Sequence, residues 1–338
     1  MITNTVVELE GVNGEWFNLT TGDHGVYLAT DVEGCFYDPP VKVALEEPGN
    51  YPGARYLNHR ILKRDIVFGA QILNDSKSGS KSWLSRDSEW RKAWAFDRDC
   101  KLYVTTPDSG TRYLKVRLFE SPTVDMRTDP RGNSINLTVM SVVAYDPFWY
   151  EDDRVFSVKT KQDTRFKPSF IDVPGDWPWE RQPQETLKIT VDAGDGGLNP
   201  TDQYIAPKWT VPGSTEQIPE FPWPFPPGID IPWERAPYTQ FVLPDYSFED
   251  AEHANRRLKL PGLIYRENCV IDTDRRAEQI VSESGSQVWA RMNGVRFRNM
   301  IPPYTEKATF EITASGCAAG QVITLRLPRP WTRCWGLE

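Results

Sequence analysis

Residues 111–119 read TRYLKVRLF, and this stretch carries the clearest signal of the fold. Apolar and charged residues mostly alternate along it: Tyr113, Leu114, Val116 and Leu118 against Arg112, Lys115 and Arg117. A period of two is typical of an antiparallel strand with one buried and one solvated face. The stretch therefore predicts a half-buried β-strand whose charged side chains face solvent.

Similar runs occur on both sides of this strand. They are rich in Val, Ile, Tyr and Thr, are separated by Gly, Pro and Asp-Ser clusters, and lie at residues 25–30, 53–73, 100–106 and 135–150. A second β-rich region extends from residue 186 to residue 338. With 28 Pro and 23 Gly in 338 residues, the chain is predicted to be mostly β and rich in turns.

One stretch predicts an α-helix, residues 81–96, which read KSWLSRDSEWRKAWAF. Trp83, Trp90 and Trp94 recur at helical spacing and share one face. Each tryptophan can bury about 150–250 Å². We therefore expect this face to pack the helix onto a sheet rather than to bind a cofactor.

The length of 338 residues favours two domains. After residue 152 the sequence becomes polar and loses its period, which predicts a linker over residues 153–184 between a domain of residues 1–152 and one of residues 185–338. PWERQP at 178–183 returns as PWERAP at 232–237, and these six residues leave two docking segments and coincidence both open.

The second domain contains a long insertion, residues 212–240, with PEFPWPFPPGIDIPWERAP at 219–237. Its prolines predict a stiff, extended segment without internal hydrogen bonds. Four large aromatic residues lie on it, namely Phe221, Trp223, Phe225 and Trp233. The segment either covers its own domain or binds a neighbouring molecule, and the second interpretation makes these four residues partner contacts.

Charge and composition exclude several classes of protein. The net charge of −8 argues against a general binder of nucleic acid or anionic membranes, and no apolar run is long enough to span a membrane. The N-terminal residues show no secretory signal. The five cysteines are scattered without a C-x-x-C pair, so we expect them to be reduced and mostly buried, in a protein made in a reducing cytoplasm.

The sequence contains no recognisable catalytic motif, and we predict no catalytic residue, no metal site and no cofactor. The three histidines lie in unrelated contexts. Asp192, Asp195 and Asp202 miss the spacing of a calcium loop and are more typical of turns. The acidic pairs Asp152/Asp153 and Asp272/Asp274 are of the type a glycosidase needs, but we expect solvated loops there.

The ordered set of β-runs resembles the distal tail proteins of long-tailed bacteriophages, called minor tail proteins in phages of actinobacteria. The N-terminal half carries the resemblance in residues 14–34, in YDPPV at 37–41, and in residues 52–72, 88–120 and 144–150. The C-terminal half carries it in IAPKWTVPG at 205–213, LPDYSF at 243–248, VIDTD at 270–274, and residues 297–313 and 328–338. The predicted linker and the Pro-rich segment lie outside it.

This resemblance implies an antiparallel β-barrel-like N-terminal domain with one helix and a C-terminal galectin-like β-sandwich with a Pro-rich insertion. It further implies a hexameric ring in the virion tail tip that joins the tail tube to the hub. The implied partners are other copies of the chain, the tail tube protein, the tape-measure protein and the hub and receptor-binding proteins. DNA would only pass through as genome, and no membrane insertion is implied.

A subunit that assembles head to tail must bury two different faces. The predicted candidates are the tryptophan-bearing helix and the charged strand with Arg112 and Arg117. A carbohydrate-binding adsorption protein that recognises host glycans remains the alternative, although a lone Trp289 is expected to be core rather than a platform for sugar stacking.

Overall fold

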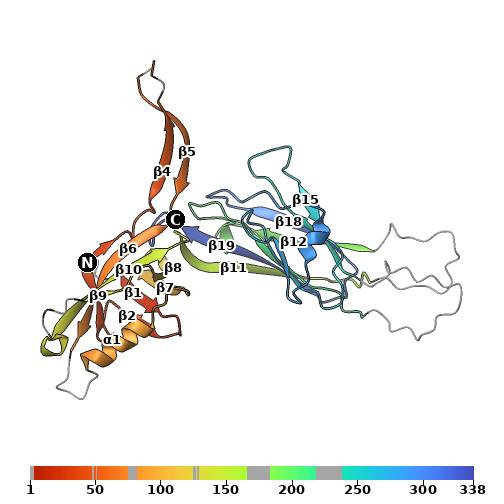
Figure 1. The fold of residues 1–338 in the computed structure, drawn as a ribbon. Helices are drawn as coiled ribbons and strands as arrows, with labels where there is room; N and C mark the ends of the chain where they lie inside the picture. The colour runs from red at the N-terminus through yellow and green to blue at the C-terminus, as the bar shows by residue number, and fades with distance from the viewer. Residues whose placement is uncertain are drawn as a thin grey trace, which may run out of the picture. The chain divides into compact units, whose positions relative to one another are not determined.

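The computed structural model describes residues 4–338 except 48, 51, 75–81, 125, 126, 128, 166–182 and 218–237. The chain divides into two compact units, Met1–Asp152 with Pro330–Glu338 (unit 1) and Asp153–Arg329 (unit 2). Figure 1 traces the elements of both. Strands dominate both units and pair antiparallel, which confirms the predicted mostly-β class.

Unit 1 consists of antiparallel strands and one α-helix. The elements are β1 (Val6–Glu10), β2 (Trp16–Asn18), β3 (Val26–Glu33), β4 (Val41–Glu46), β5 (Arg55–Ile61), β6 (Arg64–Leu73), α1 (Trp83–Lys92), β7 (Cys100–Thr106), β8 (Gly110–Leu118), β9 (Thr123–Val124), η1 (Pro130–Gly132), β10 (Ile135–Ala144) and β11 (Trp149–Lys159). The strands pair in the order β11-β8-β10-β6-β3, and β7, β1 and β2 continue from β8.

The core of unit 1 contains the side chains that alternation predicts. Leu114, Val116 and Leu118 of β8 are buried together with Phe68 of β6 and Met140 of β10. The helix α1 is shorter than the predicted 81–96 because its last helical residue is Lys92. Trp83, Trp90 and Trp94 nevertheless all lie in the core, the last just beyond the helix, and this confirms the packing prediction.

Strands β4 and β5 form a separate two-stranded sheet. Figure 1 shows them as an arm that projects beyond the other strands of unit 1. Every residue of β4 and all of β5 except Ile61 are exposed. An isolated hairpin of this kind is at best marginally stable in water.

Unit 2 contains two further sets of antiparallel strands. Its elements are β12 (Gln184–Val191), η2 (Ala193–Asp195), β13 (Lys208–Val211), β14 (Gln240–Pro244), β15 (Arg257–Lys259), β16 (Cys269–Asp272), β17 (Ile280–Ser282), η4 (Val288–Met292), β18 (Ala308–Ser315) and β19 (Val322–Trp331). One set pairs as β12-β18-β14-β15 and the other as β17-β16-β13-β19-β11. Trp209, Phe241 and Phe310 lie in the core of this unit.

Two features differ from the expected division of the chain. Residues 153–159, expected in a linker, continue strand β11, and Phe156 and Val158 pack against the core of unit 2. Residues 330–338, expected in the C-terminal domain, group with unit 1. The boundary therefore falls within two continuous strands, β11 and β19, where no change of composition marks it.

Candidate functional site

Strand β10 turns an apolar face away from the core of unit 1. Met140 and Val142 point into the core, whereas the intervening positions of the strand include exposed Ile135, Leu137 and Val139. Val67 of β6 lies on the same side, opposite Ser141. These four side chains are 39–52% exposed, and we call them the outer face (Val67, Ile135, Leu137 and Val139).

Gly69 lies in the middle of the outer face. Gly69 pairs with Val139 across the two strands. A Cβ atom at this position would lie 2.7 Å from Leu137 Cδ1 and 2.9 Å from Ala29 Cβ. The glycine therefore lets Leu137 lie across β6. Exposed apolar patches on such a surface usually mark contacts with another molecule.

Arg117 lies at one end of this surface, opposite Val143 of β10. Its Nε atom donates to Asp99 Oδ1 at 2.6 Å, and its guanidinium lies 5.2 Å from the centroid of the Tyr145 ring. The Arg117 side chain is 27% exposed. Hydrogen bonding to Asp99 raises the pKa of Arg117 above its usual value. The residue is charged and accessible, so its predicted role in assembly remains a proposal.

Arg112 lies in the interior of unit 1, not on the charged surface that the sequence predicted. Its side chain is fully buried. The guanidinium donates to Glu151 Oε1 at 3.1 Å and to Glu338 Oε1 at 2.6 Å, and also to the carbonyl oxygens of Arg333 and Gly336. Side chains of a strand alternate between its two faces. Arg112 is two residues before Leu114, so it lies on the same buried face of β8 as Leu114, Val116 and Leu118. It is therefore a structural residue and offers no surface contact.

Two further arginines hold the segment of residues 330–338 in unit 1. Buried Arg64 donates to the carbonyl oxygens of Pro147, Cys35, Tyr37 and Thr332. Arg333 forms a two-pronged ion pair with Asp38, at 2.8 and 2.6 Å. This hydrogen bonding from Arg333 holds the pKa of Asp38 below its usual value. The segment is fixed by charged hydrogen bonds in addition to its apolar contacts.

A row of aromatic rings crosses a second sheet surface of unit 1. Trp16, Tyr103, Tyr113 and Tyr150 follow one another with ring centroids 5.0, 5.7 and 6.0 Å apart. Tyr103 Oη donates to Glu10 Oε2 at 2.8 Å, and Lys101 Nζ donates to the same atom at 2.9 Å. The Lys101 hydrogen bond, followed by that from Tyr103, lowers the pKa of Glu10. Glu10, Lys101 and Tyr103 thus form one hydrogen-bonded group beside the row of rings.

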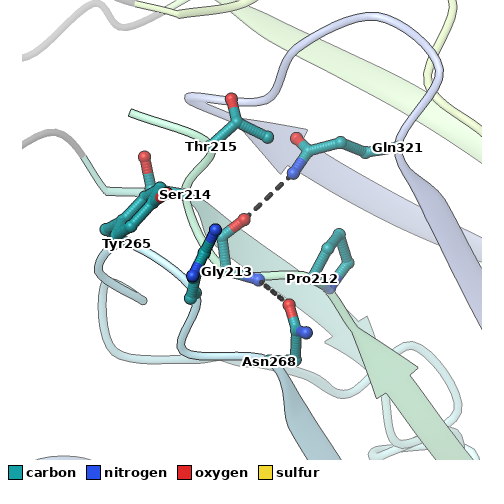
Figure 2. Close-up of a pocket in the computed structure, with 8 residues that line it drawn as sticks. Pro212, Gly213, Ser214, Thr215, Tyr265, Asn268 and Gln321 are labelled. Carbon is teal, nitrogen blue, oxygen red and sulfur yellow. Dashed lines mark hydrogen bonds between the residues drawn. The ribbon is translucent and has the colours of Figure 1, made fainter. Parts of the chain in front are cut away.

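The shallow pocket of unit 2 in Figure 2 has a volume of about 330 Å³. Two amides in its wall are already used. Asn268 Oδ1 accepts from the Gly213 N–H at 3.0 Å, and Gln321 Nε2 donates to the Gly213 carbonyl at 3.0 Å. A Cβ atom at Gly213 would lie 2.5 Å from Glu267 N, so only glycine fits this turn. The side-chain amides of Asn268 and Gln321 therefore hold the backbone at Gly213 through these hydrogen bonds.

The four aromatic residues predicted as partner contacts, Phe221, Trp223, Phe225 and Trp233, lie outside the described residues. Trp289 does not belong to the core, contrary to expectation: it lies in η4 and is 48% exposed. Its neighbours Val288 and Met292 supply the buried side of this 3₁₀ turn.

The titratable groups of unit 2 are largely paired. Lys208 binds Asp272 at 2.7 Å, Arg276 binds Asp274 at 2.8 Å, and Arg326 lies 3.7 Å from Asp153. Asp192 Oδ1 accepts from the Gly194 N–H, as in an ordinary turn. Among the residues that the structure describes, potential metal ligands come together only at Asp250, Glu252 and His253, all exposed. An exposed acidic cluster alone defines no metal site.

All five cysteines are buried and free, as predicted. Burial raises the pKa of Cys35, Cys100, Cys269 and Cys317 to about 12, and also raises that of Cys334. Thiolates are therefore scarce at neutral pH. Over the described part of the chain, no helix is both long and apolar enough to cross a membrane.

The fold matches that of a known phage tail protein. No model of a known protein family matches the sequence. The Dit (gp 19.1) protein of SPP1, described as a paradigm of hub adsorption apparatus in phages that infect Gram-positive bacteria, aligns with a TM-score of 0.52 at 13% identity. The alignment covers 96% of this chain and 98% of that protein. The fold is thus that of the distal tail protein class, which confirms the predicted resemblance.

Sequence comparison gives the family itself. The chain is 80% identical to minor tail protein Gp27 of Mycobacterium phage D29 and 79% identical to minor tail protein Gp27 of Mycobacterium phage L5. Both comparisons span 338 residues and the whole of each chain. The chain therefore belongs to the Gp27 family of mycobacteriophage minor tail proteins.

Proposed function

We propose that this protein is a structural component of the phage tail tip, where copies of it form a ring that joins the tail tube to the hub. One observation carries the proposal: a full-length relationship to minor tail proteins coincides with a fold of the distal tail protein class. A member of this class is expected to act through contacts with other tail proteins rather than through turnover.

The surface of unit 1 supports a role in assembly. The outer face and the hairpin β4–β5 both expose apolar side chains. Grouped apolar side chains on a protein surface usually mark a contact with another molecule. The acidic pairs that a hydrolase would need are instead engaged with basic neighbours, as at Asp272 and Asp274. This arrangement favours a non-enzymatic function.

The proposed partners are those of a tail-tip ring. They are further copies of the chain in a hexamer, the tail tube protein, the tape-measure protein, and the hub and receptor-binding proteins. DNA passes the ring only as genome, and the net charge of −8 disfavours its retention. The ring is a virion component that is synthesised in the host cytoplasm.

Electron microscopy of the purified full-length protein and of purified tails tests this function. We expect closed rings in the first sample. In the second, antibody labelling should be confined to the end of the tail opposite the head. Labelling along the whole tube, or at the head, would contradict the proposed position.

A second candidate function is glycan binding by unit 2, and the exposure of Trp289 favours it. Indole rings are suited to stacking against the apolar face of a sugar. A glycan array probed with the full chain and with a Trp289→Ala variant tests this candidate. The full chain is required because Phe156 and Val158, which precede residue 184, pack against the core of unit 2. Equal array signals from both proteins would exclude Trp289 as a platform.

A further inference from the structure

Unit 2 exposes two arginines on a short segment between η4 and β18. Arg296 and Arg298 lie at the surface on either side of Phe297, whose ring is buried in the core of the unit. Phe297 therefore anchors the segment, and the two guanidinium groups that flank it remain accessible to a ligand.

Two buried polar side chains fix the backbone of this segment. Gln279 Nε2 donates to the Phe297 carbonyl at 3.0 Å, and Gln279 Oε1 accepts from the Phe297 N–H at 2.9 Å. The Asp245 carboxylate accepts from the N–H groups of Arg298 and Asn299, each at 3.1 Å. Because the backbone is held in advance, less conformational freedom is lost when the arginines bind a ligand.

Two further arginines converge on the same segment. Arg275 donates from Nε and Nη2 to the Arg298 carbonyl, at 2.8 and 2.6 Å. Arg256 Nη2 donates to the Arg296 carbonyl at 2.9 Å. Burial lowers the pKa of Arg256, and the positive charge of Arg298 lowers it further. We call these four residues the arginine cluster (Arg256, Arg275, Arg296 and Arg298).

Most of the positive charge of the arginine cluster is not neutralised. Among the described residues, one carboxylate forms an ion pair with the cluster, namely Asp245 with Arg256. The other three arginines form no ion pair within the part of the chain that the structure describes. Asp274, next to Arg275 in the sequence, is paired with Arg276 at 2.8 Å instead. Four guanidinium groups against one carboxylate leave three positive charges.

Basic side chains elsewhere in unit 2 commonly have a carboxylate partner. Examples are Lys188 and Arg257 with Glu311, Lys208 with Asp272, and Arg291 with Glu267. Like charges that are grouped without counter-ions repel one another, and a bound anion removes this repulsion. The arginine cluster is therefore suited to an anionic ligand.

A phosphate group matches the chemistry of the arginine cluster. A guanidinium group binds phosphate or carboxylate oxygens with two parallel hydrogen bonds. A phosphate group carries more acceptor oxygens and more negative charge than a carboxylate, so it can accept from several guanidinium groups at once. Phe297, the apolar side chain between Arg296 and Arg298, is buried. The cluster thus lacks at this point the apolar centre that is typical of a protein–protein contact.

We propose that the arginine cluster binds a phosphate group, either as the free ion or as the phosphate of a phosphorylated saccharide. Both sources present the same oxygens to the guanidinium groups. With a phosphorylated saccharide, the site extends the second candidate function to an anionic glycan. The phosphate site itself rests neither on Trp289 nor on the ring.

Phosphorus-31 NMR of inorganic phosphate and of glucose 6-phosphate tests this site, with the full chain in a chloride buffer. We expect the signals of both ligands to broaden in proportion to the bound fraction and to saturate. An Arg296→Gln/Arg298→Gln variant should bind at least about tenfold more weakly, the effect of losing hydrogen bonds to a charged group. Both side chains are exposed, so the variant should melt as the parent does.

An Arg165→Gln/Arg326→Gln variant is the matched control. It also removes two positive charges from unit 2, but from arginines that lie beside carboxylates, Asp163 and Asp153. This control should bind both ligands as the parent does. Equal weakening in the two double variants would show a general effect of net charge and would overturn the site, as would the absence of binding by the parent.

Two further measurements identify the source of the anion. Binding of glucose 6-phosphate without binding of inorganic phosphate or glucose would support the site in its saccharide form. A labelled peptide of glutamates that binds the parent but not Arg296→Gln/Arg298→Gln, with neither phosphate ligand bound, would assign the cluster to an acidic protein segment and overturn the proposal. The phosphate titration reads a single subunit, so its outcome is independent of whether rings form.

Discussion

The guanidinium carbon of Arg112 lies 3.9 Å from the centroid of the Trp331 ring. This pair joins the start of β8 to the end of β19, more than two hundred positions later in the chain, and both side chains are buried. Stacking of a desolvated guanidinium on an indole adds to the ion pairs with Glu151 and Glu338. The segment of residues 330–338 is thereby part of the core of unit 1.

Replacement of Arg112 is expected to destabilise unit 1 strongly. Arg112→Met would remove the donor of two partly exposed carboxylates and two carbonyl oxygens. A hydrogen bond to a charged group contributes about 1.5–3 kcal/mol. Lys115→Met, an exposed position on the same strand, is the control and should change the free energy of unfolding by less than about 0.5 kcal/mol. Urea unfolding of both variants measures the difference, and equal midpoints would contradict this role for Arg112.

Trp94 is predicted to be essential for the fold. Its side chain is 3% exposed and packs on Trp90 and Phe68, with ring centroids 5.4 and 6.0 Å away. Trp94→Ala should reduce the free energy of unfolding by about 3–5 kcal/mol. Phe96→Ala, at a position that is 48% exposed, is the comparison and should cost far less. Thermal melting with circular dichroism detects the contrast.

Arg117→Glu should weaken assembly and spare the fold. Its ion pair with Asp99 is partly exposed, and such pairs contribute about 0–1 kcal/mol. Reversal of the charge places a carboxylate at the end of the outer face. Lys188→Glu, which breaks a comparable exposed pair with Glu311 in unit 2, is the control. If the Arg117→Glu protein forms oligomers as readily as the control, this end of the strand lies outside the contact.

Unit 2 should lose stability in acid through Glu267. Burial alone would raise the pKa of this carboxyl, but hydrogen bonds from Arg291, Ser286 and the Ile264 N–H outweigh it, so the pKa is lowered. A carboxyl with a lowered folded-state pKa stabilises fully above its unfolded pKa, and this contribution is lost as the pH falls through the folded value.

The measurement is the free energy of unfolding of the parent and of Glu267→Gln between about pH 7 and pH 3. At neutral pH the variant should be less stable by about 1.5–3 kcal/mol, the range for hydrogen bonds to a charged group. The difference should shrink as the pH falls below the unfolded pKa of Glu267. Two parallel curves would show that another group carries the acid sensitivity.

The Pro-rich segment of residues 219–237 yields the last prediction. If Phe221, Trp223, Phe225 and Trp233 bind a partner, replacement of the segment by a short Gly-Ser linker leaves the melting temperature of the isolated protein unchanged. Incorporation into tails then falls. A melting temperature that drops by several degrees, or normal incorporation, would instead indicate that the segment covers its own domain or is dispensable.

The sequence predicts strands and core residues correctly where apolar side chains recur with the period of a strand or a helix. Leu114, Val116 and Leu118 are buried as alternation requires, and Trp83, Trp90 and Trp94 are buried as helical spacing requires. The surface position predicted for Arg112 is wrong because the alternation of β8 turns it to the same side as Leu114. A buried guanidinium is stable when its donors have acceptors.

Other features depend on contacts that no local pattern encodes. In β4, Val41, Val43 and Leu45 alternate with other residues as in a half-buried strand, yet the whole strand is exposed. Trp289 looks like core because of its size, but Val288 and Met292 fill the space under its turn. Residues 330–338 belong to unit 1 because Arg64 and Arg112 donate hydrogen bonds to carbonyl oxygens in this segment. The donors and acceptors lie far apart in the sequence, so no local pattern predicts the contact.

The interrupted path of the chain through unit 1 also sets an order of events during synthesis. Residues 330–338 leave the ribosome only after the whole of unit 2, residues 153–329, has been translated. Until then Arg112 and Arg64 lack several of their acceptors and the Trp331 ring is missing. All residues of unit 2 are therefore available before the last residues of unit 1, although unit 1 contains the N-terminal residues. Unit 2 can complete its fold first, because domains fold as units. The core of unit 1 is thereby completed only after the whole of unit 2 has been translated.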